Sequence, residues 1–379
     1  MASTSELSVA FDATALLDRP TGIGVFVGEL LSGLAARPEV DVRAFAVSFR
    51  GRGGLAQRVP AGVTVRSRPI PARLARLAWQ RTDHPTSRWL AGPTDVVYGP
   101  NYVVPPGGGA AEVVTVSDLS AIRFPEMCSA DVLQWPHLLT RALARGAWVH
   151  TISEFVADEV RALHPAAAER IVAVPLAVRR PPPPTATTDA ARGCHLAGGD
   201  RYVLALGTVE PRKDLPSLVA AFDALAAEDR DLRLVLAGPD GLGVEALTAA
   251  RDAARHRSRI VRLGWVNDSQ RLALLRGASV VAYPSRYEGF GLVPLEALAV
   301  GTPVVATAVG ALSEVLGDGG LLVPPADPDA LASALGLLLA DQGVRRDSLA
   351  RGTARVDAYS WEATVAAMVG LYRQAAAAR

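Results

Sequence analysis

The organisation of this chain is decided by one stretch, Tyr283-Pro-Ser-Arg-Tyr-Glu-Gly-Phe-Gly-Leu-Val-Pro-Leu-Glu-Ala-Leu-Ala-Val-Gly-Thr-Pro-Val-Val-Ala306. The apolar run that ends where this stretch begins predicts a buried parallel strand, and residues 284–291 form the loop after it. A helix is predicted over Leu292–Val300, with Pro294 in its first turn, where proline is tolerated. Val304–Ala306 predicts the next strand. This succession of strand, loop and helix is typical of an open parallel α/β sheet.

Two carboxylates, Glu288 and Glu296, stand in the loop and the helix of this unit. In open α/β sheets, a Gly-rich loop that leads from a strand into a helix N-terminus is where anionic ligands bind. Glu288 can accept hydrogen bonds from hydroxyls, and Glu296 can hold a ribose diol as an ionised acceptor. The backbone N–H groups expected to face phosphate or sugar oxygens belong to Gly289, Phe290, Gly291 and Leu292. Alternatively, Glu288 caps the loop and Glu296 is a solvated helix residue.

Lys213 is the only lysine among 39 basic side chains, and all the others are arginines. It lies next to Arg212, a few residues after the predicted strand Tyr202–Leu206. Lysine presents a compact point charge, whereas arginine presents a planar fork, so a single retained lysine indicates a site that needs the compact charge. The alternative is an ordinary surface pair on a first helical turn.

Together, these motifs resemble those of the GT4 family of retaining glycosyltransferases, the glycosyl transferases group 1, which adopt the GT-B fold. The resemblance covers nearly the whole chain and is more specific in its second half. It implies an α/β fold of two Rossmann-like parallel-sheet domains facing across a cleft, with a C-terminal helix that crosses back to the first domain. It also implies that Glu288 contacts the donor sugar hydroxyls and Glu296 the nucleotide ribose. Arg212 and Lys213 would grip the donor diphosphate in place of a metal.

The domain boundaries follow from the alternation of short apolar strands with helical patterns, which a low-periodicity segment rich in Pro, Thr, Ala and Gly interrupts. We expect an N-terminal acceptor-binding domain over 1–180, a Pro-rich linker over 181–199 and a nucleotide-sugar-binding domain over 200–358. The crossing helix is expected over 359–379, with Trp361 as its packing anchor.

The resemblance adds further donor-binding residues. The glycine of the loop after strand Tyr202–Leu206 is Gly207, and Gly264-Trp265-Val266 resembles the segment whose backbone lies against the nucleobase. Gly22 and Gly24, ahead of a helix expected from Val25, resemble the loop that faces the donor phosphates. A tight strand-to-helix turn would also explain these two glycines.

Ser117 and Asp118 follow a predicted strand at the position where many members of the family have His-Asp. A serine hydroxyl can donate a hydrogen bond, but it cannot change its charge near neutral pH as imidazole does. The difference leaves open an enzyme that is weakly active or differently tuned. Asp118 either orients the acceptor hydroxyl or caps the loop.

The overall composition narrows the partners and the compartment. A net charge of +1 gives no support for nucleic acid as a partner, and Cys128 and Cys194 fit neither a zinc cluster nor a disulfide framework. The sequence shows no signal peptide and no apolar run long enough to span a bilayer, so we expect a cytoplasmic protein, at most peripheral at the inner membrane face. The segment 66–88 holds six arginines and one acid. It is either a basic amphipathic helix that lies on anionic lipid or a solvated face whose apolar stripe packs on the sheet.

The resemblance implies a metal-independent retaining glycosyltransferase that needs no cofactor. Its donor would be GDP-mannose or a UDP-hexose, and its acceptor a hydroxyl of a glycan, a lipid-linked carrier or a small molecule. Two alternatives stay open. The first is another GT-B enzyme, such as a nucleotide-sugar epimerase or a phosphorylase relative, for which no acid–base group or cofactor lysine is evident. The second is a protein that binds nucleotide sugars with little transfer activity.

Overall fold

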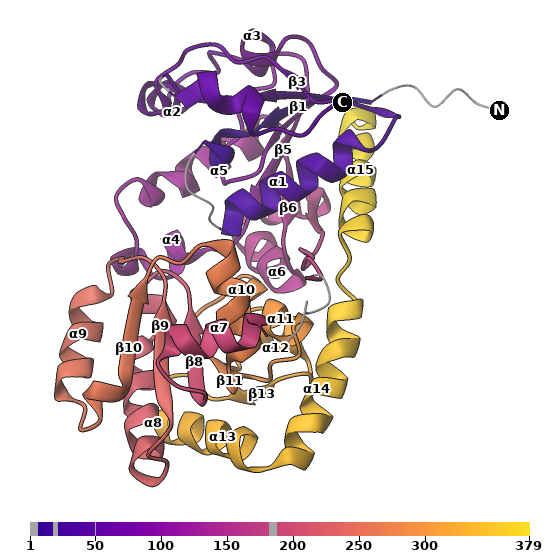
Figure 1. Ribbon diagram of the computed structural model, residues 1–379. Helices are drawn as coiled ribbons and strands as arrows, with labels where there is room; N and C mark the ends of the chain where they lie inside the picture. The colour runs from indigo at the N-terminus through magenta and orange to yellow at the C-terminus, as the bar shows by residue number, and fades with distance from the viewer. Residues whose placement is uncertain (1–6, 18–21, 50, 182–187) are drawn as a thin grey trace. The chain divides into compact units, whose positions relative to one another are not determined.

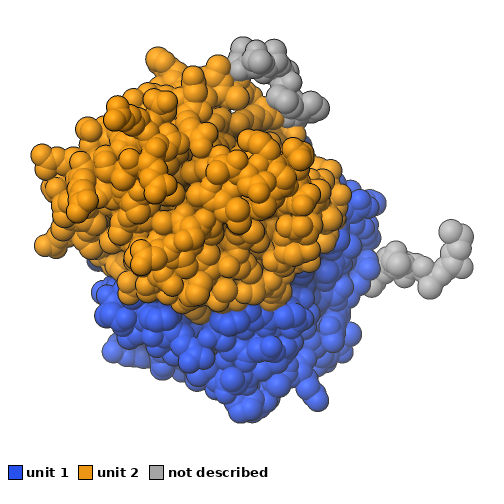
Figure 2. Space-filling view, turned by 90° about the horizontal axis from the view of Figure 1, so that it is seen from below, with its two compact units in different colours: residues 1–177, 361–379 blue, residues 178–360 orange. Residues whose placement is uncertain are grey.

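The computed structural model describes residues 7–17, 22–49, 51–181 and 188–379, which form two α/β units (Figure 1). Unit 1 comprises residues 1–177 together with 361–379, and unit 2 comprises residues 178–360 (Figure 2). Each unit is built on its own sheet, and every strand pairing within the two sheets is parallel. The predicted α/β fold with two parallel sheets is therefore confirmed.

The sheet of unit 1 has seven strands in the order β3-β2-β1-β4-β5-β6-β7. Every residue of the three neighbouring strands β4, β5 and β6 is buried, as expected of a parallel sheet covered on both faces. The strands are β1 (Leu7–Asp12), β2 (Val40–Phe45), β3 (Thr64–Val65), β4 (Val96–Gly99), β5 (Ala111–Val116), β6 (Trp148–Thr151) and β7 (Ile171–Ala173).

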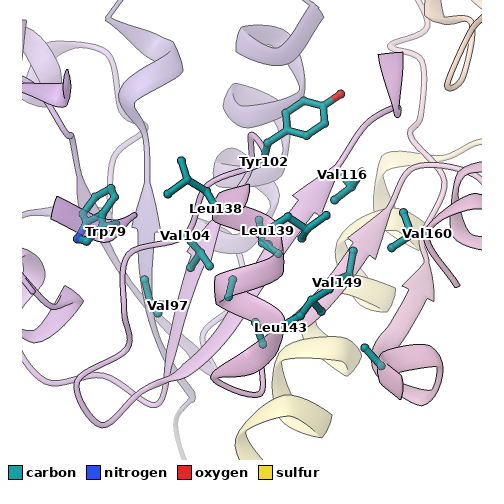
Figure 3. Packing of buried hydrophobic residues seen from close by; sticks show 14 of the residues in the cluster. Trp79, Val97, Tyr102, Val104, Val116, Leu138, Leu139, Leu143, Val149 and Val160 are labelled. Atoms are coloured by element: carbon teal, nitrogen blue, oxygen red, sulfur yellow. The ribbon is translucent and has the colours of Figure 1, made fainter. Parts of the chain in front are cut away.

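The helices of unit 1 cover this sheet with apolar side chains. Figure 3 shows Leu138, Leu139 and Leu143 of one helix, α5, lying over valines of the sheet such as Val97 and Val149. The α-helices are α1 (Gly22–Ala35), α2 (Ala72–Trp79), α3 (Ser87–Ala91), α4 (Ser120–Arg123), α5 (Trp135–Ala144), α6 (Glu154–Leu163) and α15 (Trp361–Ala377).

The C-terminal helix α15 belongs to unit 1, although it follows unit 2 in the sequence. Its Trp361 ring stacks on Phe26 of α1 at a centroid distance of 6.3 Å, in the anchoring role predicted for it. One face of the helix is buried, and Tyr372 on that face lies 5.3 Å from Tyr98 of β4, centroid to centroid. Large aromatic contacts at both ends therefore fix α15 on the first sheet.

The sheet of unit 2 has six strands in the order β10-β9-β8-β11-β12-β13. The strands are β8 (Tyr202–Leu206), β9 (Arg233–Ala237), β10 (Ile260–Gly264), β11 (Val280–Tyr283), β12 (Val304–Thr307) and β13 (Leu321–Val323). The α-helices are α7 (Thr188–Ala197), α8 (Leu215–Glu228), α9 (Val244–Ala253), α10 (Asp268–Gly277), α11 (Leu292–Ala299), α12 (Leu312–Leu316), α13 (Pro328–Ala340) and α14 (Gln342–Asp357). Among the described helices, none combines the length and apolarity that a membrane span requires.

Helix α7 corrects the predicted linker over 181–199. Residues 188–197 of that range are helical, and residues 182–187 lie outside the described residues. The helix packs closely on α10, because a Cβ added at Gly193 would lie only 2.2 Å from the carbonyl oxygen of Ala273. An ion pair between Asp189 and Arg276 ties the same two helices together. The small residues that suggested a linker are thus the ones that allow two helices to approach closely.

Candidate functional site

A pocket lies at the topological switch point of unit 2, between the neighbouring strands β8 and β11. From these two central strands the chain winds toward opposite edges of the sheet. In open α/β sheets, ligands bind outside the carboxyl ends of the strands at such a point. The residues that line this pocket where the strands end include Gly207, Thr208, Lys213, Gly238, Arg262, Tyr283 and Ser285.

Glu288 stands at the centre of a cluster of hydrogen-bond donors beside this pocket. Its Oε2 atom accepts hydrogen bonds from Lys213 Nζ at 2.6 Å, from the Tyr283 hydroxyl at 2.8 Å and from Arg212 Nη1 at 3.2 Å. Its side chain is only 12% exposed. The structure therefore brings together Arg212, Lys213 and Glu288, three of the predicted residues. It adds Tyr283, which sequence reasoning treated only as the end of a strand.

The charges of this cluster follow from its burial. Burial by itself would raise the pKa of Glu288, but the neighbouring Lys213 and Arg212 cations lower it to about 2. Burial lowers the pKa of Lys213, while the Glu288 carboxylate opposes that change. The pKa of Tyr283 is raised well above its usual value, first by burial and then by Glu288, so its hydroxyl stays protonated and donates. Glu288 is therefore an ionised acceptor held by fixed donors.

The loops that carry Lys213 and Glu288 are joined at a second place. The backbone N–H of Arg286 donates to the carbonyl of Arg212 at 2.7 Å, and the Arg286 guanidinium pairs with the buried Asp214 at 3.1 Å. Arg212 also pairs with Glu210 at 2.8 Å. Because both loops are tied at their backbones and side chains, the cation pair is held in place before any ligand binds.

The Gly-rich loop ends at Gly291, the residue before helix α11. Gly291 has a φ of +108°, and a Cβ there would lie 2.6 Å from a methyl carbon of Leu312. Both the backbone conformation and the lack of space therefore disfavour a side chain at this position. The first amides of α11, from Leu292 onward, have no carbonyl partner within the helix, as at any helix N-terminus. Gly289 and Phe290 complete the loop. Phe290 is buried with its ring edge-on to Tyr359 at 5.5 Å, which makes it a packing residue.

Glu296, the second predicted acid, is held separately from the Glu288 cluster. Both of its carboxylate oxygens accept from the guanidinium of Arg271 on α10, and one of these contacts is 2.7 Å. Sequence reasoning missed Arg271, because 25 residues separate it from Glu296. Only the fold shows that α10 and α11 run close enough for a fork-to-fork ion pair.

The segment predicted to face the nucleobase adjoins the same pocket. Gly264, with a φ of +66°, ends β10, and its carbonyl accepts from the N–H of Gly238, a pocket-lining residue, at 2.7 Å. Trp265 is exposed and Val266 is half-buried. Asn267 then starts α10 with a capping box, in which it and Gln270 exchange side-chain to backbone hydrogen bonds. Of the predicted donor residues, Gly207 therefore lines the pocket, and Gly264 is hydrogen-bonded to a residue that lines it.

Ser117 and Asp118 follow the last residue of β5 in unit 1. The Asp118 carboxylate accepts from the Ser120 N–H at 2.9 Å and from the Ser120 hydroxyl at 2.6 Å. The Asp118 N–H donates to the Tyr102 hydroxyl at 2.9 Å. Asp118 therefore caps the loop, which is one of the two roles considered for it.

Gly22 and Gly24 lie inside the first turn of α1, because this helix begins three residues earlier than predicted. At the end of the preceding strand, Asp12 accepts from the Thr14 N–H at 2.9 Å. Burial raises the pKa of Asp12 to about 6, although the hydrogen bonds from Thr14 oppose the change.

Comparison with known proteins supports the family assignment. The sequence model of "Glycosyl transferases group 1" matches residues 189–355, which contain the whole pocket described above. The O-antigen chain mannosyltransferase B of Escherichia coli is 33% identical over 304 residues, 79% of this chain and 77% of that protein. This chain belongs to the glycosyl transferases group 1 family. It is accordingly a glycosyltransferase, and the resemblance read from the sequence is confirmed.

Further relatives of the group 1 family agree with this assignment. The phosphatidyl-myo-inositol mannosyltransferase of Mycolicibacterium smegmatis is 38% identical over 176 residues, 45% of each chain. Among solved structures, sucrose-phosphate synthase from Thermosynechococcus elongatus superposes with a TM-score of 0.75 at 23% identity, covering 98% of this chain and 100% of its own. The glycosyltransferase WaaG gives a TM-score of 0.71 at 17% identity, covering 97% and 98%. At such identities the structural likeness shows the fold, which is the predicted GT-B fold.

Proposed function

We propose that this glycosyltransferase moves a hexose from a nucleotide-diphosphate sugar to a hydroxyl acceptor, with retention of configuration and without a metal ion. The observation that carries the proposal is the buried cluster of Lys213, Arg212 and Glu288 at the switch point of unit 2. The Lys213 ammonium has three N–H donors, and two of them are directed to Glu288 and Tyr283. The third is left for a phosphate oxygen in the pocket that Lys213 lines.

Several of the predicted site residues have a role in this scheme. Arg212, Lys213 and the first amides of α11 hold the diphosphate, and Glu288 accepts hydrogen bonds from the sugar hydroxyls. Glu296 holds the ribose diol, and the backbone near Gly264 lies against the base. Acceptor binding is assigned to unit 1, where Ser117 and Asp118 follow β5.

In the proposed reaction, the bond between the anomeric carbon and the phosphate oxygen breaks while the bond to the acceptor oxygen forms on the same face of the sugar. The acceptor proton passes to the leaving diphosphate, so atoms and charge balance without a protein nucleophile. Negative charge grows on the diphosphate during this step. Arg212 and Lys213 stabilise it because they are preorganised in a buried site.

The donor is proposed to be GDP-mannose, with UDP-hexoses as the alternative. The Escherichia coli relative that aligns over 79% of this chain is named a mannosyltransferase, and this supports a mannosyl donor. The acceptor is proposed to be a glycan, a lipid-linked carrier or a small molecule that offers a hydroxyl group.

A thermal-shift screen against GDP-mannose, UDP-glucose and UDP-N-acetylglucosamine tests donor binding. A donor at 100 times its Kd should stabilise the protein by about 2.7 kcal/mol, while donors of the wrong base leave the melting temperature unchanged. Failure of every nucleotide sugar in the panel to stabilise the protein would contradict the proposal.

Mass spectrometry of the products distinguishes the proposed transferase from its alternatives. Transfer yields a glycosylated acceptor and a nucleoside diphosphate. An epimerase of the GT-B fold would instead release a changed sugar. A binding protein with little transfer activity would return the nucleotide sugar intact. Ser117 is the reason to test this alternative, because many family members have a histidine there.

We also propose that unit 1 associates with anionic membranes through its basic α2 surface. This surface consists of the six arginines of segment 66–88 together with Leu74 and Leu77. Ala75 and Trp79 of α2 are buried, whereas Leu74 is 60% and Leu77 is 45% exposed. Exposed leucines among arginines suit an interface between water and anionic lipid.

Co-sedimentation with phosphatidylglycerol vesicles at low salt tests this association. Binding is expected for the unchanged protein and should fall for Leu74→Ser/Leu77→Ser. Leu337→Ser is the matched control, because Leu337 is 44% exposed on α13 of unit 2. Equal sedimentation with neutral phosphatidylcholine vesicles, or no sedimentation at all, would contradict the proposed surface.

A further inference from the structure

We infer that Arg271 is a positioning residue for the nucleotide ribose, which it serves by fixing the carboxylate of Glu296. The inference rests on the proposed function, in which Glu296 receives the ribose diol. The two residues come from neighbouring helices, Arg271 from α10 and Glu296 from α11. Their side chains meet as a two-pronged ion pair in which Nη1 and Nη2 donate to Oε1 and Oε2 respectively.

The geometry of this pair determines what Glu296 can still accept. An ionised carboxylate has about four lone-pair sites on its two oxygens, and a forked guanidinium occupies one on each. One site on each oxygen is then left, and these two outer sites point away from each other in the plane that the guanidinium fixes. One hydroxyl of the ribose can donate to one of them. Arg271 therefore leaves Glu296 able to accept from a ribose hydroxyl and removes the freedom of the carboxylate to rotate.

Charge provides a second reason for the pair. Donor binding places a diphosphate near the first amides of α11, and Glu296 lies on the next turn of the same helix. A lone carboxylate there would repel the diphosphate. Arg271 neutralises it, so the same residue can bind hydroxyls close to phosphate without weakening phosphate binding.

Arg271 is itself placed by the start of α10. The capping box of Asn267 and Gln270 fixes the first turn of this helix, and the N–H of Arg271 donates to the carbonyl of Asn267 at 2.8 Å. The Arg271 side chain therefore leaves the helix one turn after a well-defined start. It is about one-third exposed and Glu296 about one-fifth, so the pair is accessible to a ligand without being fully solvated.

The test compares the binding of GDP with 2′-deoxy-GDP, and of UDP with 2′-deoxy-UDP, by calorimetry. The unchanged protein should bind the ribose form of its preferred pair about tenfold more tightly, as expected for a hydroxyl bonded to a charged acceptor. Arg271→Gln should reduce this ratio to about one, and Glu296→Gln should do the same. Arg271→Lys keeps the charge but not the fork, so it should retain GDP affinity better than Arg271→Gln while discriminating the diol poorly.

Arg276→Gln is the matched control on the same helix, since Arg276 pairs with Asp189 of α7. It should leave the ratio unchanged even if it lowers the melting temperature. The inference is overturned if Arg271→Gln weakens both members of a pair equally, because that is the result of a purely structural role. It is also overturned if Arg271→Gln binds the ribose forms more tightly, because Arg271 would then be a competitor for Glu296. If the unchanged protein binds neither GDP nor UDP, the proposed function itself fails, and this inference fails with it.

Discussion

Replacing Lys213 by methionine removes the ammonium from the Glu288 cluster while keeping an unbranched apolar stem. The pKa of Glu288 is about 2 in the folded protein against the usual 4.5. That difference corresponds to about 3 kcal/mol in favour of the ionised carboxylate, at ~1.4 kcal/mol per pKa unit. In Lys213→Met, the carboxylate keeps as donors Tyr283 at 2.8 Å, Arg212 at 3.2 Å and the Ser285 hydroxyl at 3.5 Å. We expect the free energy of unfolding at pH 7 to fall by about 3 kcal/mol, the lower end for a broken buried pair.

The pH dependence follows from the same numbers. Because the folded pKa of Glu288 is depressed, its contribution to stability is present above pH 4.5 and is lost as the pH falls toward about 2. In Lys213→Met the pKa of Glu288 in the folded protein rises, so the carboxylate becomes protonated at a higher pH. Once protonated, it is no longer a poorly compensated buried charge. The stability gap between the two proteins should therefore be widest at neutral pH and shrink as the solution is acidified.

Urea unfolding between about pH 3 and pH 7 measures this gap, and transfer to acceptor measures turnover at a temperature where both proteins are folded. Lys213→Met should lower turnover by about 10²-fold or more, as when a preorganised charge donor is lost. Leu335→Ala is a control for stability alone, since Leu335 is fully buried in the core of unit 2 and its truncation costs about 2–5 kcal/mol. It should keep its turnover. Unchanged turnover in Lys213→Met, or a gap that does not vary with pH, would refute the reasoning.

Three further outcomes are expected. Gly291→Ala should lower the unfolding free energy by about 1–3 kcal/mol and weaken nucleotide-sugar binding, measured by denaturation and calorimetry, because its φ is +108°. Tyr283→Phe should cost about 1 kcal/mol of stability, measured by urea unfolding, since it removes one donor to Glu288. Saturating EDTA should leave the initial transfer rate unchanged if cations of the protein hold the diphosphate; loss of activity restored by a divalent metal would contradict this.

The local structure around the deciding stretch could be predicted because short-range chemistry specifies it. Strand β11 and the start of α11 match the expectation, since a continuous apolar run precedes a loop whose glycine takes a positive φ. Helix α7 was not predicted, because short-range sequence does not specify it. Its sequence has little apolar periodicity, and its contact with α10 is long-range, because 87 residues separate Asp189 from Arg276.

The candidate site was predictable in its residue types but not in its pairings. The isolated lysine and the Glu288 loop each indicated a functional role from local sequence. Lys213 donates to a carboxylate oxygen of Glu288, which lies 75 residues further along the chain. Neither spacing nor composition predicts this contact. The pairing of Arg271 with Glu296 could not be predicted either, because only the fold brings α10 and α11 together.

The two acids of the motif differ in the partners that the protein gives them, and this difference supports the separate roles proposed for them. Glu288 is buried and shares one oxygen among Lys213, Arg212 and Tyr283, so its other oxygen is the one available for a sugar hydroxyl. Glu296 has both oxygens paired symmetrically by Arg271, so it presents one free site on each. In the proposed function, the other oxygen of Glu288 accepts from a hydroxyl of the hexose, and Glu296 accepts from a ribose hydroxyl at a site that Arg271 leaves unoccupied. Each acid also carries its own cation, so a diphosphate bound as proposed would meet no uncompensated negative charge.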